Sequence, residues 1–236
     1  ERGGLNGYWT DYVIKHPSKG RLTGLNDENK PLNTLENFLL NQAPTVLATQ
    51  QRFEIFKTEI QKKLGDATSL ASIPCGLMAD LLDLDFTNTP NVFLKGIDLD
   101  PESITYAEQY AKTLNLNDHC KFSQCDAWSL NIHEEFDLIT SNGLAMYEPN
   151  DAKVTELYRG FYEALKPGGY LITSFLTPPP VSGLKTEWKL EAVNMQDVLL
   201  QKIVFADILD CKWQVFRSEE IVRIYKLGSN SFSTGC

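Results

Sequence analysis

The stretch Gly96-Ile97-Asp98-Leu99-Asp100-Pro101 joins an apolar run to a helical one. Residues 92–95 before it are mainly apolar, and residues 103–114 after it have a helical pattern, whose first turn the proline at 101 fixes. This order is typical of a strand that leads into a helix in an α/β protein. In an open parallel sheet, a carboxylate at the C-terminal end of a strand is well placed to bind a ribose diol. Asp98 is therefore the first candidate ligand-binding residue.

A glycine in an earlier strand-to-helix turn supports this interpretation. Gly76 precedes Asp98 by 22 residues. A glycine-containing phosphate-type turn and the acid that binds the ribose are typically about 20 residues apart. Together the two features predict a cofactor that contains a nucleoside.

Composition narrows the classes of partner. The 236 residues suit one domain, or one domain with a small cap. The net charge of −9 disfavours binding to nucleic acid, and no apolar run is long enough to span a membrane. The five cysteines are odd in number and lack metal-ligand spacing. We therefore expect reduced thiols and no metal site. No signal peptide is visible in the sequence, and together with the reduced thiols this predicts a cytoplasmic setting. The oligomeric state stays open.

The chain divides into two parts by pattern. Residues 1–68 have the pattern of helices and loops and predict an N-terminal helical cap or lid, with helices over 8–15, 34–41 and 44–64, a polar loop over 20–31 and Thr34 as a helix cap. After residue 68, short apolar runs alternate with helical ones. The predicted strands lie near 69–73, 92–98, 120–125, 136–141 and 169–176, and the helices near 76–83, 102–114 and 151–165. This alternation indicates βαβ units and a parallel sheet.

A run of prolines at 178–180 ends the alternating pattern. Beyond it, the sequence predicts one long helix near 187–209 and a shorter one near 218–227. The second part of the chain is thus a domain over 69–236 that carries a helical insertion at 181–210.

Five short motifs follow one another between residues 69 and 176. They are Ile-Pro-Cys-Gly at 73–76, the quoted stretch at 96–101, Gln-Cys-Asp-Ala-Trp at 124–128, Phe-Asp-Leu-Ile-Thr-Ser-Asn at 136–142 and Leu-Lys-Pro-Gly-Gly-Tyr-Leu-Ile at 165–172. In this order they resemble the class I S-adenosylmethionine-dependent methyltransferases. The resemblance implies a three-layer Rossmann-like sandwich with a mostly parallel seven-stranded sheet, closed by an antiparallel hairpin. With a helix assigned to 218–227, only residues 229–236 remain for that hairpin, so we expect either an abbreviated hairpin or one whose remaining residues lie outside this sequence.

The resemblance also implies a site for S-adenosylmethionine, with S-adenosylhomocysteine as the product. Asp98 would accept hydrogen bonds from both ribose hydroxyls. Leu99 would pack on the adenine ring, and Asp126 would bind the amino group of the adenine. The backbone N–H groups at Gly76 would meet the methionine carboxylate. The complete implied set is Ser72, Pro74, Cys75, Gly76, Asp98, Leu99, Asp126, Ala127, Trp128, Ser141 and Asn142.

The first motif departs from the family pattern of an acid followed by three alternating glycines. Ser72 stands in place of the acid, Pro74 in place of the first glycine and Met78 in place of the last, so that only Gly76 is kept. Without the acid, the ammonium of the cofactor needs other acceptors, such as Ser72 or backbone carbonyls. These changes also leave open the alternative of a non-catalytic descendant of the fold that acts as a cofactor-binding or interaction protein.

The acceptor side is less defined. Aromatic rings can stabilise a sulfonium, and candidates for lining it and the acceptor are Tyr8, Trp9, Tyr12 and Tyr147. His16 and Tyr147 are the candidate catalytic residues for proton removal. The function predicted from the resemblance is methyl transfer to a small-molecule acceptor by in-line displacement.

Overall fold

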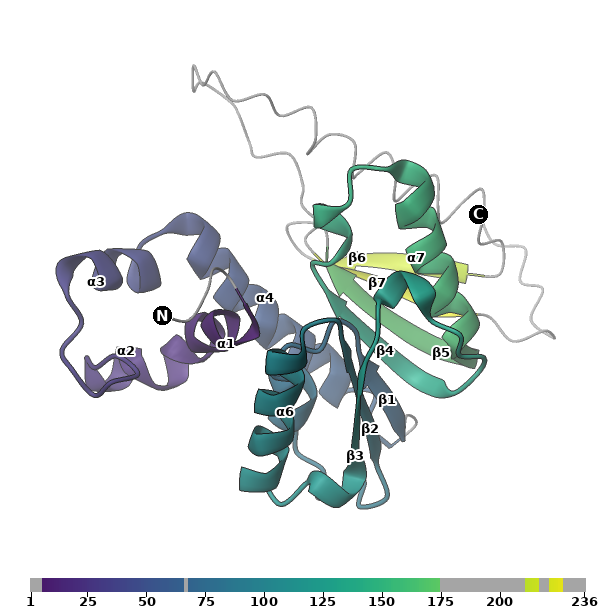
Figure 1. Ribbon diagram of the computed structural model, residues 1–236, viewed down its shortest axis with the longest axis horizontal. Helices are drawn as coiled ribbons and strands as arrows, with labels where there is room; N and C mark the ends of the chain where they lie inside the picture. The colour runs from purple at the N-terminus through teal and green to yellow at the C-terminus, as the bar shows by residue number, and fades with distance from the viewer. Residues whose placement is uncertain (1–5, 66–67, 175–210, 217–220, 227–236) are drawn as a thin grey trace.

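The structure is a computed structural model that describes residues 6–65, 68–174, 211–216 and 221–226. Its N-terminal helices extend from one side of a central sheet (Figure 1). They are α1 (Gly7–Lys15), α2 (Gly20–Thr23), α3 (Thr34–Asn41) and α4 (Pro44–Gln61), with a 3-10 helix, η1, over His16–Ser18. The α2 helix lies inside the region predicted as loop. The predicted cap of α3 was wrong by one residue, because Asn33 and Glu36 form a reciprocal capping box.

The sheet has seven strands in the order β3-β2-β1-β4-β5-β7-β6. Their bounds are β1 (Ser69–Ser72), β2 (Phe93–Asp98), β3 (Cys120–Gln124), β4 (Phe136–Asn142), β5 (Leu165–Ser174), β6 (Cys211–Phe216) and β7 (Ile221–Lys226). The first five strands are parallel, and the last two form an antiparallel hairpin that pairs with β5. This confirms the predicted Rossmann-like α/β fold with a mostly parallel sheet.

Helices cover both faces of the sheet. On one face, α4, α5 (Ala79–Leu82) and α6 (Pro101–Thr113) bury a cluster that includes Phe56, Leu81 and Ala107. On the other face, α7 (Asp151–Ala164) buries Leu157 and Phe161. The three layers follow from apolar positions on both sides of each parallel strand.

Two expectations about the second half of the chain were wrong. Residues 221–226, predicted as part of a helix, form strand β7, and β6 lies at 211–216, so the closing hairpin comes from residues before 229 and not from the chain end. The β-branched residues Ile221, Val222 and Ile224 favour a strand, and β5 provides the partner. The predicted insertion at 181–210 and the helix at 187–209 lie outside the described residues.

The helix predicted over 76–83 is reduced to the four residues of α5. Gly76 and Met78 have φ values of +50° and +56°, in the left-handed region, so a helix cannot begin before residue 79. Along the described part of the chain, no helix is long and apolar enough to cross a membrane. The same ranges contain no group of three or more His, Cys, Asp or Glu side chains that could hold a metal ion.

Candidate cofactor site

The candidate site lies where the parallel strands end. Ser72, Asp98, Gln124 and Asn142 are the last residues of β1, β2, β3 and β4. Because these strands are neighbours and parallel, their carboxyl ends meet at one edge of the sheet (Figure 1). Ligands of open α/β sheets bind outside this edge.

Two backbone N–H groups orient the carboxylate of Asp98. Gly76 donates to Oδ2 at 2.8 Å and Asp100 donates to Oδ1 at 2.9 Å. An ionised carboxylate has about four acceptor positions, so two remain for hydroxyl groups of a ligand. The structure thus joins the first turn and the ribose-binding position, which lie far apart in the sequence.

The first turn has two residues in the left-handed conformation that favours glycine, although it contains one glycine. Gly76 and Met78 are both left-handed. Met78 is fully buried, and its side chain packs in the core beside Gly96. The N–H of Cys75 donates to the carbonyl of Ile97 at 2.9 Å, and burial raises the pKa of the Cys75 thiol. Backbone bonding therefore holds the turn against β2.

The region beside Asp98 suits an adenine. Leu99 is 64% exposed, an unusual position for a large apolar side chain, and its carbonyl accepts the amide of Gln124 at 3.1 Å. Asp126 is exposed and accepts the backbone N–H of Trp128 at 3.0 Å, while Ala127 is buried between them. An apolar face and an exposed carboxylate are thus both present near the ends of β2 and β3.

The other predicted cofactor residues are committed to contacts within the protein. The indole N–H of Trp128 donates to the carbonyl of Lys153 in α7 at 2.8 Å, and its ring packs against the α7 side of the core. Ser141 is buried. Asn142 accepts the hydroxyl of Ser174 at 3.2 Å.

Helix α1 begins directly at the first turn. A Cβ atom added to Gly7 would lie 3.1 Å from the Cα of Gly76 and 2.6 Å from the Ser103 hydroxyl oxygen. The ring of Tyr8 lies 5.9 Å from that of Tyr106 in α6, and Trp9 stacks edge-on with Tyr8 at 5.3 Å. The structure therefore brings Tyr8 and Trp9 toward the candidate site.

The remaining candidates lie in different environments. Trp9 also contacts the ring of Tyr12 at 6.0 Å, and burial together with Glu36 raises the pKa of Tyr12 to about 12. Tyr147 is 78% exposed beyond β4, in a 3-10 helix over Ala145–Tyr147. His16 is buried, and its Nε2 bonds to Asn41 at 3.0 Å. The His16 contacts described by the structure all lie within the N-terminal helices.

Comparison with known proteins assigns the family. The sequence model of the methyltransferase domain family matches residues 73–224, well over half of the chain. The chain belongs to the class I methyltransferases. Their cofactor is S-adenosylmethionine.

Two curated relatives are methyltransferases of small molecules. The erythromycin 3''-O-methyltransferase of Saccharopolyspora erythraea is 35% identical over 85 residues, which is 35% of this chain and 26% of the relative. The trans-aconitate 2-methyltransferase of Streptomyces coelicolor is 30% identical over 112 residues, 45% of this chain and 34% of the relative. The matched part thus spans about a third or less of these methyltransferases.

Solved structures agree with this methyltransferase fold. A protein of Bordetella parapertussis described as a possible exported protein is 35% identical, with a TM-score of 0.72 over 96% of this chain and 80% of its own. The N-methyltransferase NodS of Bradyrhizobium japonicum, solved with S-adenosylhomocysteine, is 16% identical, with a TM-score of 0.55 over 92% of this chain and 99% of its own. The second likeness shows the fold alone.

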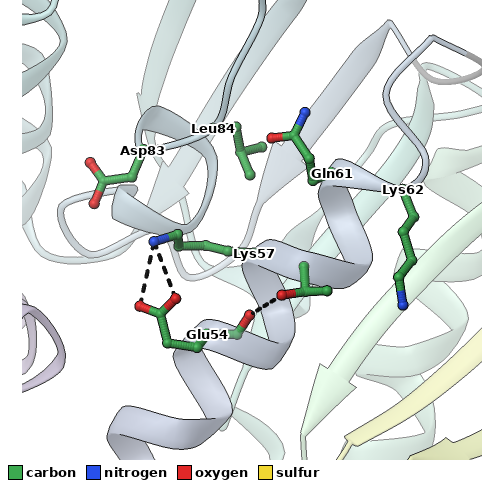
Figure 2. A pocket seen from close by; sticks show the side chains of 7 residues that line it. Glu54, Lys57, Gln61, Lys62, Asp83 and Leu84 are labelled. Carbon is green, nitrogen blue, oxygen red and sulfur yellow. Dashed lines mark hydrogen bonds and ion pairs between the residues drawn. The ribbon is translucent and has the colours of Figure 1, made fainter. Parts of the chain in front are cut away.

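The methyltransferase also has a surface groove of about 500 Å³ (Figure 2). It lies between α4 and the segment after α5, and is lined by Glu54, Lys57, Thr58, Gln61, Lys62, Asp83 and Leu84. Lys57 pairs with Glu54 at 3.4 Å inside it. The groove is thus lined mainly by polar and charged side chains of the helical face, and none of them was predicted to bind the cofactor.

Sequence reasoning did not single out two residues that contact the first turn or the strand end before it. Gly7 was not singled out, because nothing in the sequence shows which segment lies against Gly76. Asp80 was missed although a signal existed, since it is the one charged residue in the apolar run 77–82. A lone charge in such a run indicates a buried partner.

Proposed function

We propose that this methyltransferase transfers a methyl group from S-adenosylmethionine to a small-molecule acceptor. The observation that carries the proposal is the Asp98 carboxylate, held by Gly76 and Asp100 at the carboxyl edge of the sheet with two acceptor positions left. A surface helix cap does not require such an arrangement. Asp100 already caps α6, so Asp98 is available for a ligand.

The chain's own residues have defined tasks in this proposal. When bound, S-adenosylmethionine supplies a methyl group on a positively charged sulfur. Asp98 would hold the ribose, and Leu99 and Asp126 the adenine. The N–H groups of Cys75, Gly76 and Met78 are already bonded to Ile97, Asp98 and Cys75, so the expectation that the Gly76 turn binds the carboxylate of the amino-acid end through them was wrong. Helix α1 lies over the turn and would exclude water from that end. Holding donor and acceptor in line contributes most of the catalysis in such a displacement.

A small molecule is the favoured acceptor class. The net charge of −9 opposes binding to nucleic acid, and the names of the two curated relatives refer to erythromycin and to trans-aconitate. The aromatic residues at the start of α1 and the exposed Tyr147 offer candidate surfaces for it. Tyr147 and His16 stay candidates for proton removal. The cytoplasmic setting also stays a prediction.

Calorimetric titration tests the cofactor half of the proposal. S-adenosylmethionine and S-adenosylhomocysteine are titrated into the native protein, the Asp98→Asn variant and the control Asp118→Asn. Asp118 is an exposed carboxylate that precedes β3, and so lies at the opposite edge of the sheet. We expect affinity to fall by about tenfold to a hundredfold in Asp98→Asn only, since bonds to a charged acceptor contribute about 1.5–3 kcal/mol.

Transfer of labelled methyl groups to a panel of small hydroxylated, carboxylated and amine acceptors tests the second half. Binding together with transfer supports the proposed enzyme. Binding with no transfer to small molecules, nucleic acid or protein would favour the non-catalytic descendant, for which Ser72, Pro74 and Met78 in the first motif are the sequence evidence.

A further inference from the structure

A buried carboxylate lies behind the first turn of the site. Asp80 in α5 is 7% exposed and accepts the hydroxyl of Ser72, at 3.1 Å to Oδ1 and 3.0 Å to Oδ2. Its Oδ2 also accepts the hydroxyl of Thr140 at 2.5 Å. Burial raises the pKa of the Asp80 carboxyl, and the two hydroxyl groups oppose that rise. An acid is thus present beside the residue that stands where the family pattern has one.

The position of this contact is set by the strands. Ser72 and Thr140 are register partners on the neighbouring strands β1 and β4, and both are buried. Paired residues of parallel strands point to the same face, so both hydroxyls reach one carboxylate that comes from the helix above them. Asp80 therefore ties α5 to the last residue of β1 and to β4.

The same contact closes the first turn. The turn runs from residue 73 to residue 78, so Ser72 precedes its first residue and Asp80 follows its last residue by two positions. The bond between them holds both ends of the loop that carries Gly76, while the middle of the loop bonds to Asp98. The Ser72 hydroxyl donates its hydrogen bond to Asp80, so the lone pairs of its oxygen are left to accept from another group.

We propose that Asp80 takes the place of the acid missing from the first motif, as a positioning residue for the amino-acid end of S-adenosylmethionine. It holds the turn at Gly76 and orients the Ser72 hydroxyl as an acceptor for the ammonium group. This inference rests on the proposed function. Burying a carboxylate costs free energy that apolar packing would not, which argues for a role beyond filling the core.

Ligand selectivity tests the role. S-adenosylhomocysteine and 5′-methylthioadenosine share adenine, ribose and sulfur, but only the first has the amino-acid end. Both are titrated into the native protein, Asp80→Asn and the control Asp85→Asn, an exposed carboxylate in the loop after α5. We expect Asp80→Asn to weaken binding of S-adenosylhomocysteine by at least about tenfold and of 5′-methylthioadenosine by less than about threefold, with Asp85→Asn unchanged.

If Asp80 has only a structural role, Asp80→Asn should weaken the binding of both ligands by the same factor. If Asp80 has no role, the affinities for both ligands should stay unchanged. Either result would overturn the inference. If Asp80→Asn does not fold by thermal melting, Thr140→Val, which removes one hydroxyl at nearly constant volume, carries the same expectation. Failure of the proposed function looks different, because the native protein itself would then bind neither ligand.

Moving the acid back provides a second test. The double variant Ser72→Asp with Asp80→Ser returns a carboxylate to the position of the family pattern and conserves the pair. We expect it to recover the S-adenosylhomocysteine affinity that Asp80→Ser alone loses. If the double variant binds S-adenosylhomocysteine as weakly as Asp80→Ser alone, a carboxylate at position 72 cannot replace the one at position 80, which contradicts the inference.

Discussion

Met78 packs so closely against Gly96 that a Cβ atom added to Gly96 would lie 3.1 Å from the Met78 sulfur. Met78 has a φ of +56°, in the left-handed region that favours glycine. A non-glycine residue in this region costs about 1–3 kcal/mol unless its surroundings compensate. Here the buried side chain provides the compensation, since it fills the space that the bare backbone of β2 leaves open.

Substitution of Gly96 by alanine is expected to destabilise the fold. The new Cβ would also lie 2.5 Å from a ring carbon of Phe122, so the ring or the turn at Met78 must move. Overpacking of this kind costs about 1–3 kcal/mol, measurable by urea unfolding. The control is Gly160→Ala in α7, where the nearest atom, the Cβ of Leu130, is 4.0 Å away. That control should be neutral or stabilising by up to about 1 kcal/mol.

Substitution of Gly7 by alanine is expected to lift the start of α1 from the first turn. The added Cβ would be 2.6 Å from the Ser103 hydroxyl oxygen and 3.1 Å from the Gly76 Cα, which is backbone and cannot rotate away. We expect S-adenosylhomocysteine affinity to fall about threefold to tenfold, or about 0.7–1.4 kcal/mol. Thr10→Ala, at an exposed position of the same helix, is the control for calorimetry. Equal affinities of the Gly7 variant and the native protein would show that α1 does not cover the cofactor.

Substitution of Lys15 by methionine is expected to loosen the cap. The Lys15 ammonium is 2.7 Å from Asp11 and 3.6 Å from the ring centroid of Tyr110 in α6, and its side chain is 7% exposed. The hydroxyl of Tyr110 in turn donates to Asp83. Removing one partner of a buried pair costs about 3 kcal/mol, because the other charge is left without compensation.

A double-mutant cycle separates this charge effect from lost packing. Burial already raises the pKa of Asp11, and Lys15 opposes that rise. The pair Lys15→Met with Asp11→Asn should therefore be less destabilised at neutral pH than the sum of the two single variants, as measured by urea unfolding. Strict additivity would mean that the contact has no coupling energy.

Mild acid is expected to destabilise the protein through His16. Burial lowers the pKa of His16, and the Asn41 contact opposes this only in part. The unfolded chain binds a proton at the ordinary pKa of about 6.5, whereas the folded chain stays neutral below it. Stability is thus fully present above about pH 6.5 and falls as the pH drops toward the folded pKa, by at most about 1.4 kcal/mol per pH unit.

Comparison with His16→Gln isolates this contribution, since glutamine can still donate to Asn41 but does not titrate. We expect the native protein to lose more unfolding free energy than the variant between pH 7.5 and pH 5.5. A pH dependence that is identical in both proteins would show that His16 does not titrate differently on folding.

Local patterns were enough for much of the fold. Short apolar runs followed by helical ones predicted the five parallel strands and the helices after β2 and β4, because each element can be identified from its own residues. The motif order pointed to the family, and Asp98 and Gly76 were paired from spacing alone. The hairpin was misassigned because six-residue runs such as 221–226 fit a helix or a strand, and pairing with β5 decides between them.

By itself the sequence determined the α/β class, the family and Asp98 as the candidate ribose-binding carboxylate, since all three depend on residue types in order along the chain. Only the tertiary structure decided that Gly7 lies against Gly76, that Met78 takes a left-handed backbone and packs beside Gly96, and that Asp80 reaches Ser72 and Thr140. Those contacts join residues from separate elements. Their distances depend on how helices pack on strands, which no local pattern records.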